Sequence, residues 1–405
     1  MLQHVFVRAV CVTFSLCDIA CAGTSKEPDG DRTQTVSVDV VHPAASASTS
    51  APKRAHSFGI VEVALGDQYT CARSDVGEVY CWGSNEFGVL GDPGVPDQHR
   101  PRRVQLPRPA IQVGTGNYCS CALLDNHQVA CWGSREKGNI GDGQAFDGPP
   151  TAPVTLGLTN ITRLAVEEAI GYAIDDQGVV FTWGPSRCVS GVPRSPKVCE
   201  VLQGASTLRE SAFVGCWTNA SGETRCWGGF VNNCGNPVNR ERKPPGQLIS
   251  LPGPVKDIAP EISNVCALLE GGEVYCWGDT QFGDLGCPAS PKKLPGLANV
   301  TSFRVFLHTL CAIHSDGSVS CAGDNRHGIL ANRTLESRST FAPIEGLSNV
   351  KQLDLDTHAC AVTKDHKLFC WGENDRGQLG DGTIQQRLTP VEVVFDPGWG
   401  RSQSR

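Results

Sequence analysis

One motif recurs seven times along the 405-residue chain and constrains the fold more than any other feature. A Trp-Gly pair, replaced once by Ala-Gly, ends a short apolar segment at intervals of 44 to 51 residues. The seven positions are Trp82, Trp132, Trp183, Trp227, Trp277, Ala322 and Trp371. Every unit contains four short strand-like segments separated by turn residues and shows no helical periodicity, which is typical of one propeller blade. The sequence therefore predicts an all-β, seven-bladed β-propeller of four-stranded blades.

The boundaries of the propeller follow from the first and last repeats. We expect the blades to occupy residues 58–395, with a flexible tail at 396–405. A ring of sheets leaves no free edge if its two ends pair. We therefore predict that Leu388–Phe395 pairs with the first blade, beginning near Ile60, and so closes the ring.

Cysteine spacing adds detail to the turn between the second and third strands of each blade. Six units carry two cysteines ten residues apart, which fits a hairpin in which they face each other across a three-residue loop. Opposed strand residues approach disulfide distance, so the spacing predicts six disulfides, with reduced core thiols as the alternative. The pairs are Cys71 with Cys81, Cys121 with Cys131, Cys216 with Cys226, Cys266 with Cys276, Cys311 with Cys321, and Cys360 with Cys370. The third loop residue should be left-handed; it is Gly in four of these units but His127 and His366 in the other two.

The third unit departs from the cysteine pattern. Tyr172 and Thr182 occupy its two positions, and we predict a compensating disulfide between Cys188 and Cys199 in the following loop. Two other cysteines, Cys234 and Cys287, lie at nearly equivalent places in adjacent units and are candidates for a bridge. Under this scheme Cys119 is unpaired.

The amino-terminal segment indicates export. Residues 1–22 combine an apolar stretch, interrupted by Arg8, with an Ala-x-Ala pattern at Ala20 and Ala22, which predicts a secretory signal peptide. Lipidation at Cys21 is the alternative. Residues 23–57 are rich in Ser, Thr, Pro and Ala and are expected to form a disordered linker. With twenty cysteines in the chain, these features predict an extracytoplasmic protein, either secreted, periplasmic or on the cell surface.

Charge and motifs exclude several functions. The 35 basic and 42 acidic side chains give a net charge of −7, which argues against a nucleic-acid partner. No stretch is long and apolar enough to span a membrane as a helix. Neither a metal-ligand spacing nor a Gly-x-Ser-x-Gly nucleophile motif occurs, so we predict no catalytic residue, no metal site and no cofactor.

The segments that follow the tryptophans resemble a known repeat. They read Trp82-Gly83-Ser84-Asn85-Glu86-Phe87-Gly88-Val89-Leu90-Gly91 in the first unit and Trp371-Gly372-Glu373-Asn374-Asp375-Arg376-Gly377-Gln378-Leu379-Gly380 in the last. The pattern is similar to the repeat of the regulator of chromosome condensation family, which implies a seven-bladed β-propeller. The cysteine-containing copies resemble exported bacterial members, among which is a β-lactamase inhibitor. The family's best-known activity, nucleotide exchange on a nuclear GTPase, fits poorly with a signal peptide and disulfides.

The loop after each Trp-Gly varies most between units, and equivalent loops should lie on one face of the ring. Aromatic and arginine side chains on such loops are typical of protein-binding surfaces. The candidate binding residues are Phe87, Arg135, Lys137, Phe230, Phe282, Arg326, His327 and Arg376. Ordinary solvated loop residues are the alternative interpretation.

The sequence as a whole predicts a monomeric, exported, non-enzymatic propeller that binds an unknown protein through one face, in the manner of an inhibitor or otherwise. A glycan- or cell-wall-binding module is the first alternative. A guanine-nucleotide-exchange regulator of a GTPase, implied by the resemblance, is the second.

Overall fold

The computed structural model describes residues 58–144, 148–185, 195–199, 202, 204–211, 214–228 and 244–395. The predicted signal peptide, the linker and the carboxy-terminal tail lie outside these residues. Apart from one 3₁₀ turn, η1 (Glu136–Gly138), every regular element that is described is a β-strand. The strands form seven antiparallel sheets of four strands, so the predicted fold class is confirmed.

Each sheet is built from four consecutive strands and forms one blade. Blades 1 and 2 are β1 (Ile60–Gly66), β2 (Tyr69–Ser74), β3 (Val79–Gly83), β4 (Gln98–Arg103), and β5 (Ala110–Thr115), β6 (Cys119–Leu124), β7 (Val129–Gly133), β8 (Thr151–Thr155). Blades 3 and 4 are β9 (Ile161–Glu167), β10 (Ile170–Asp175), β11 (Val180–Trp183), β12 (Lys197–Val198), and β13 (Ala205–Glu210), β14 (Val214–Asn219), β15 (Thr224–Gly228), β16 (Gln247–Leu248). Blades 5 and 6 are β17 (Val255–Pro260), β18 (Asn264–Leu269), β19 (Val274–Gly278), β20 (Lys292–Lys293), and β21 (Val300–Phe306), β22 (Thr309–His314), β23 (Val319–Gly323), β24 (Arg338–Pro343). Blade 7 is β25 (Val350–Leu355), β26 (His358–Thr363), β27 (Leu368–Gly372) and β28 (Arg387–Glu392).

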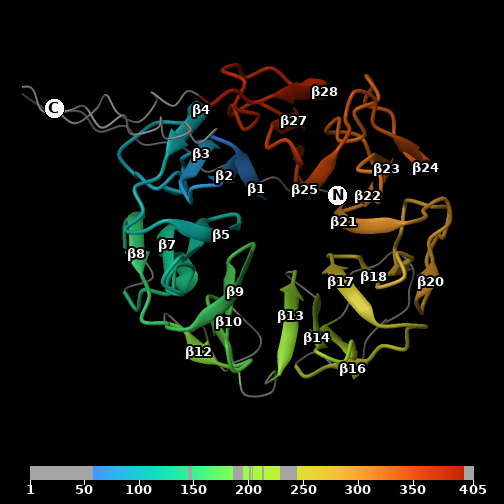
Figure 1. Cartoon of the computed structure of the whole chain (residues 1–405), viewed down its shortest axis with the longest axis horizontal. Coiled ribbons are helices and arrows are strands. Elements are labelled where there is room, and N and C mark those ends of the chain that lie inside the picture. Colours follow the sequence, from blue (N-terminus) through green and yellow to red (C-terminus); the bar gives the residue numbers. More distant parts are fainter. Residues whose placement is uncertain are drawn as a thin grey trace, which may run out of the picture. The chain divides into compact units, whose positions relative to one another are not determined.

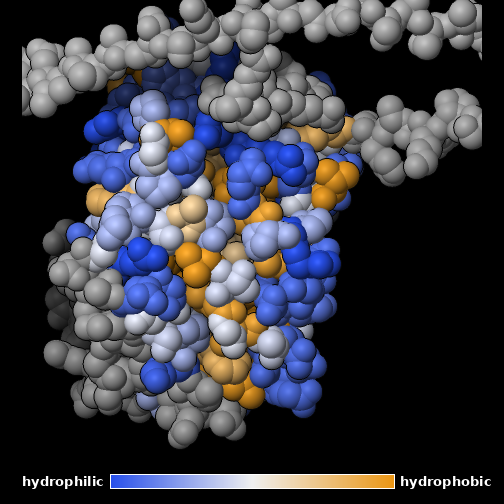
Figure 2. All heavy atoms as spheres, turned by 90° about the vertical axis from the view of Figure 1, so that its left-hand side faces the viewer, coloured by the Kyte–Doolittle hydropathy of each residue, from blue (hydrophilic) through white to orange (hydrophobic). Residues whose placement is uncertain are grey.

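The blades stand around a central axis with their first strands innermost (Figure 1). Apolar side chains from neighbouring sheets pack together between the blades. Val79 and Cys81 of blade 1, for example, share one cluster with Val113 and Trp132 of blade 2. Figure 2 shows the side at the left of Figure 1, where hydrophobic residues form a narrow band between hydrophilic margins. The hydrophobic core is therefore divided among the blade boundaries.

The repeated tryptophans join each blade to the one before it. Their rings are buried, and four indole N–H groups donate to a backbone carbonyl in the loop of the preceding blade. The donor–acceptor pairs are Trp82 with Gln378 at 2.9 Å, Trp132 with Val89 at 2.7 Å, Trp183 with Asn139 at 3.0 Å, and Trp371 with Ile329 at 2.7 Å. A buried indole N–H usually finds such a partner. These tryptophans therefore pack between neighbouring blades.

The cysteine hairpins have the predicted geometry. All six pairs are disulfides, and their cysteines occupy directly opposed positions on the second and third strands, with Cα atoms 4.0 to 4.1 Å apart. The bonded pairs are Cys71 and Cys81, Cys121 and Cys131, Cys216 and Cys226, Cys266 and Cys276, Cys311 and Cys321, and Cys360 and Cys370.

The turns of these hairpins also follow the prediction. The third loop residue is left-handed even where it is not glycine, with φ of 61° at His127 and 65° at His366. At His127 the ring Nδ1 lies 2.9 Å from the carbonyl oxygen of Ile161, which anchors the side chain to the next blade.

Ring closure differs from the sequence expectation. The prediction that Leu388–Phe395 pairs with the first blade is wrong, because β28 pairs with β27 of its own blade. One backbone hydrogen bond, from Ile60 N to His366 O at 3.0 Å, and several side-chain contacts close the ring instead. The Gln352 amide accepts a hydrogen bond from Val63 N at 2.9 Å and donates one to Val63 O at 2.8 Å. Phe395 packs edge-on against Tyr80 and Trp82, with ring centroids 5.6 and 5.8 Å away.

In the described part of the chain, no helix has the length and hydrophobicity needed to cross a membrane.

Replacing Gln352 by Leu should weaken the closed ring, because the amide and carbonyl groups of Val63 lose their partners. Leaving buried polar groups unsatisfied typically costs about 1–3 kcal/mol, so we expect a loss of about 1–2 kcal/mol in urea unfolding. Gln112→Leu is the matched control, since Gln112 makes the same two bonds to Leu164 between blades 2 and 3. A loss in the control but none in Gln352→Leu would show that closure does not depend on this bridge.

Removing one hairpin disulfide with the double substitution Cys360→Ser and Cys370→Ser should lower the free energy of unfolding by about 2–3 kcal/mol. The unfolded chain then loses one closed loop and gains conformational entropy. Thermal unfolding before and after reduction measures the effect. Under reducing conditions the variant and the parent should become equally stable, and a persistent difference would contradict a disulfide-based explanation.

Candidate functional site

One face of the ring carries all the loops that the sequence singled out. In each antiparallel blade, the turn between the first two strands and the loop between the last two strands lie at the same end. We call this end the loop face, and the opposite end, which holds the cysteine hairpins, the hairpin face. The variable loops therefore lie at the same end of the ring as the turns between the first and second strands.

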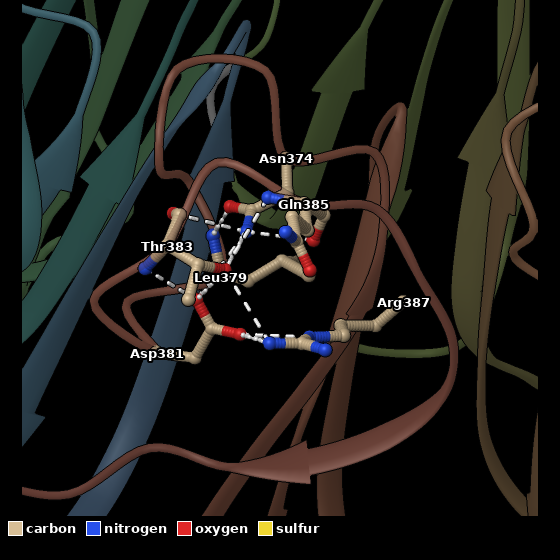
Figure 3. Close-up of polar contacts among 6 residues, drawn as sticks. All are labelled: Asn374, Leu379, Asp381, Thr383, Gln385 and Arg387. Atoms are coloured by element: carbon tan, nitrogen blue, oxygen red, sulfur yellow. Dashed lines mark hydrogen bonds and ion pairs between the residues drawn. The ribbon is translucent and has the colours of Figure 1, made fainter.

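A recurrent asparagine holds the long loops in shape. In blade 7 the Asn374 side-chain N–H donates to the carbonyl oxygens of Thr383 and Gln385 at 3.1 and 2.9 Å, and its oxygen accepts from Leu379 N at 3.0 Å (Figure 3). Asp381 accepts from Thr383 N and forms an ion pair with Arg387 at 2.7 Å in the same loop. One buried side chain thus replaces the backbone pairing that a loop lacks.

The same scaffold occurs in two other blades. Asn85 and Asn325 accept from the N–H of Leu90 and Leu330 and donate to carbonyl groups later in their loops. Sequence reasoning did not assign this role. The available signal was the recurrence of Asn three residues after the Trp position in these units.

The structure removes one of the three aromatic residues, Phe282, from the predicted binding surface. Phe282 is fully buried in the core between blades, so it is not available to a partner. Phe87 is half-buried and packs edge-on against Tyr118, with ring centroids 4.9 Å apart. Phe230 lies outside the described residues.

The predicted basic residues are placed more favourably. Lys137 is exposed, and the side chains of Arg326 and Arg376 are 67% and 44% exposed although each pairs with an aspartate. His327 lies 3.5 Å from Glu373 and is half-buried. Arg135 serves its own loop, because it pairs with buried Asp142 at 2.8 Å. Exposed cations at three blades therefore form the part of the predicted set that a partner can reach.

The central channel is a second feature of the site, and sequence reasoning missed it. A cavity of about 410 Å³ lies among the first strands of all seven blades. Nine carboxylates and two arginines line it: Glu62, Asp67, Glu167, Glu168, Glu210, Asp257, Glu261, Asp354, Asp356, Arg209 and Arg304. Many of these charged residues occupy alternate positions along their strands. In the sequence, that spacing indicates only that one face of the strand is polar.

Arg304 organises the acidic groups in the middle of the channel. Its guanidinium lies 3.5 Å from Asp257 and 3.3 Å from Asp354, on the two neighbouring blades, and donates to its own blade's Phe303 carbonyl. Asp354 also accepts from Leu65 N at 2.9 Å across the closure. This arginine thus joins three consecutive blades by charge-assisted bonds.

Carboxylates at the loop-face end of the channel have fewer positively charged partners. We define the channel mouth as Asp67, Glu167, Glu261 and Asp356, which end or follow the first strands of blades 1, 3, 5 and 7. Glu167 lies 3.8 Å from Arg209, whereas the described residues provide no ion pair for Asp67, Glu261 or Asp356. Burial raises the pKa of Glu167 and of Asp356 to about 7, and nearby carboxylates add to both shifts.

The remaining cysteines fit no catalytic arrangement. Cys199 and Cys287 are disulfide-bonded, while their predicted partners Cys188 and Cys234 lie outside the described residues. Cys119 is a free buried thiol, and burial raises its pKa to about 12, which keeps it protonated and unreactive. No group of three or more Asp, Glu, His or Cys in the described ranges is arranged to hold a metal ion.

Comparisons with known proteins agree with this architecture. Models of the regulator of chromosome condensation (RCC1) repeat match residues 76–123, and residues 60–89 and 356–378. The protein pim1 of Schizosaccharomyces pombe is 26% identical over 350 residues, covering 64% of this chain and 58% of pim1. Human E3 ubiquitin-protein ligase HERC2 is 27% identical over 243 residues, covering 52% of this chain and 5% of HERC2. The chain thus spans little more than half of pim1 and a small part of HERC2.

A solved structure supports the fold. Yeast RCC1 (Prp20), crystallised with Kap60, superposes with a TM-score of 0.67 at 18% identity, covering 88% of this chain and 91% of the yeast chain. At that identity the likeness concerns the fold alone. The recurring motif, the matching repeat models and the seven four-stranded blades together show that the chain contains repeats of the regulator of chromosome condensation (RCC1) type and folds as a β-propeller, as the solved yeast RCC1 does.

Proposed function

We propose that this protein is a non-enzymatic protein-binding module and that its partner docks on the loop face. The observation that carries the proposal is the convergence of variable loops, with exposed Lys137, Arg326 and Arg376, around an acidic channel mouth. Arginine is a common contributor of binding energy at protein interfaces. The yeast relative is a precedent for a propeller of this family in complex with another protein, Kap60.

The stiffness of the loops supports this proposal. Asn85, Asn325 and Asn374 hold their loops from within, and the next blade's tryptophan holds blades 1, 6 and 7 through a loop carbonyl. A surface that is already ordered loses less conformational entropy on binding. The charged side chains at the loop tips are thus presented by a rigid support.

Site-specific photo-crosslinking in the producing cells tests which face binds. With a photoreactive residue at position 326 or 376 we expect a discrete adduct with a second protein. The matched control places it at Asn126, an exposed position on the hairpin face. Adducts from position 126 alone, or from none of the three positions, would overturn the assignment to the loop face.

Alanine variants then test the contribution of the exposed arginines. For the protein captured by crosslinking, Arg326→Ala should weaken binding about fivefold to tenfold, the range of a typical interface arginine. Arg108→Ala is the control, because Arg108 is 52% exposed and also pairs with an aspartate, but beside the hairpin face. Equal losses in titration calorimetry for the two variants would contradict the proposal.

We further propose that the protein works in an extracytoplasmic, oxidising compartment, because six hairpin disulfides are rare in a reduced cytosol. Intact-mass spectrometry of the protein from its native cells, with and without reductant, tests this. We expect a mass that lacks residues 1–22 and that increases on reduction by two hydrogens per disulfide. Full-length, fully reduced protein would contradict export.

A further inference from the structure

The channel mouth concentrates negative charge where the fold provides little to balance it. Its four carboxylates come from the ends of the first strands of blades 1, 3, 5 and 7 and line one cavity. Of the two arginines that line the cavity, Arg304 is bound between Asp257 and Asp354, and Arg209 lies 3.8 Å from Glu167. Assembly of the ring therefore brings like charges together that the unfolded chain keeps apart.

We propose that the channel mouth is a pH-sensitive element of the fold, at which carboxyl groups bind protons as the pH falls through neutrality and thereby stabilise the ring. The geometric basis is a shared cavity and a set of convergent acidic side chains without a matching set of cations. This inference concerns the protein alone and does not depend on the proposed partner.

The groups that face each carboxylate support the inference. Glu167 faces Arg209 of β13, Arg304 of β21, Asp354 of β25 and its own neighbour Glu168. Positive and negative neighbours thus oppose each other at Glu167. The larger influence is partial desolvation inside the channel, where the side chain keeps 38% of its exposure.

The other three members of the mouth face mainly carboxylates. Glu261 faces Glu167, Glu168 and Asp356, and accepts one hydrogen bond from the backbone of Leu307. Asp356 faces Asp67 and Asp354 and accepts from Thr357 N at 2.6 Å. Asp67 faces Asp375 and Glu86 of the loops.

The pKa shifts have the direction that this geometry requires. Desolvation inside the channel, reinforced by neighbouring carboxylates, raises the pKa of Glu261 well above its usual range. Asp67 is exposed, and partial desolvation together with Asp375 and Glu86 raises its pKa above the usual value. With Glu167 and Asp356 at about 7, the folded mouth changes its charge between pH 5 and 8. In the unfolded chain the same groups titrate near pH 4.

The sign of the effect on stability follows from proton linkage. Between about pH 4 and 7 the folded state binds more protons at the mouth than the unfolded state does, so this contribution rises as the pH falls from 8 to 5. His358 acts in the opposite direction. Burial lowers its pKa to about 3, so below about pH 6.5 the unfolded state gains a proton that the folded state does not bind.

Neutral substitutions isolate the mouth from His358 and all other groups. In Asp356→Asn, the charge that repels Asp67 and Asp354 is absent at every pH. At pH 8 we expect its unfolding equilibrium constant to be about tenfold smaller than that of the parent, and at pH 5 we expect the difference to shrink to about twofold. A pKa shift of about three units would change the constant about a thousandfold, at tenfold per unit. We expect less, because Asp356 is partly exposed and its charge is screened by solvent and salt.

Two further variants complete the design. Glu167→Gln should behave like Asp356→Asn but with a smaller effect, since its side chain is 38% exposed and Arg209 is near. Asp316→Asn is the control, because hydrogen bonds from Ser318 on an exposed hairpin lower the pKa of Asp316. Its effect should be the same at pH 5 and pH 8. A pH-independent effect of Asp356→Asn, or a loss of stability at pH 8, would overturn the inference.

Carbon-13 NMR of the carboxyl groups in the unmodified, partner-free protein provides a readout that needs no variant. We expect at least two side-chain carboxyl resonances to titrate with midpoints between pH 6 and 8. If every carboxyl group titrates below pH 5, the mouth is fully charged at neutral pH and the proposal is wrong. Failure of this test leaves the protein-binding proposal intact, because crosslinking at the loops does not depend on it.

Discussion

Side-chain packing between neighbouring sheets is the interaction on which the rest of this structure depends. In the described residues each sheet is complete within its own blade, and no strand pairs across a blade boundary. The boundaries are held by apolar clusters and by single backbone hydrogen bonds from a first strand to the preceding hairpin turn, such as Ala110 N to Gly77 O. Several boundaries add an indole N–H that reaches a carbonyl of the preceding blade, or a bridging amide such as Gln352 or Gln112. Because such contacts depend on close packing, every blade contributes to the position of its neighbours.

That dependence connects the fold to the loop face. The carbonyl groups that accept from Trp82, Trp132 and Trp371 belong to loops that an asparagine also holds from within. A tryptophan thus stabilises its blade boundary and, at the same time, the preceding blade's loop. The central channel follows from the same arrangement, since seven inner strands leave a cavity whose lining is set by alternate residues.

Much of the fold could be predicted from the sequence, because the repeat places similar local signals in all seven units. Cysteine spacing predicted the hairpins with their opposed pairs, and it located the left-handed positions at His127 and His366. Ring closure could not be predicted in this way. Whether Leu388–Phe395 pairs with the first blade or with β27 depends on which edge is available in space, and both arrangements satisfy the same strand pattern.

The candidate site likewise combines features that the sequence predicts with features that depend on the arrangement in space. The sequence by itself determined the repeat, the number of blades and the loops that vary, because these depend on spacing along the chain. Only the tertiary structure decided that Phe282 is buried while Arg326 is exposed, and that Asp67, Glu167, Glu261 and Asp356 line one cavity. These carboxylates are far apart in sequence, and the physical reason for their shared behaviour is the distance between side chains on different blades, which appears only when the ring forms.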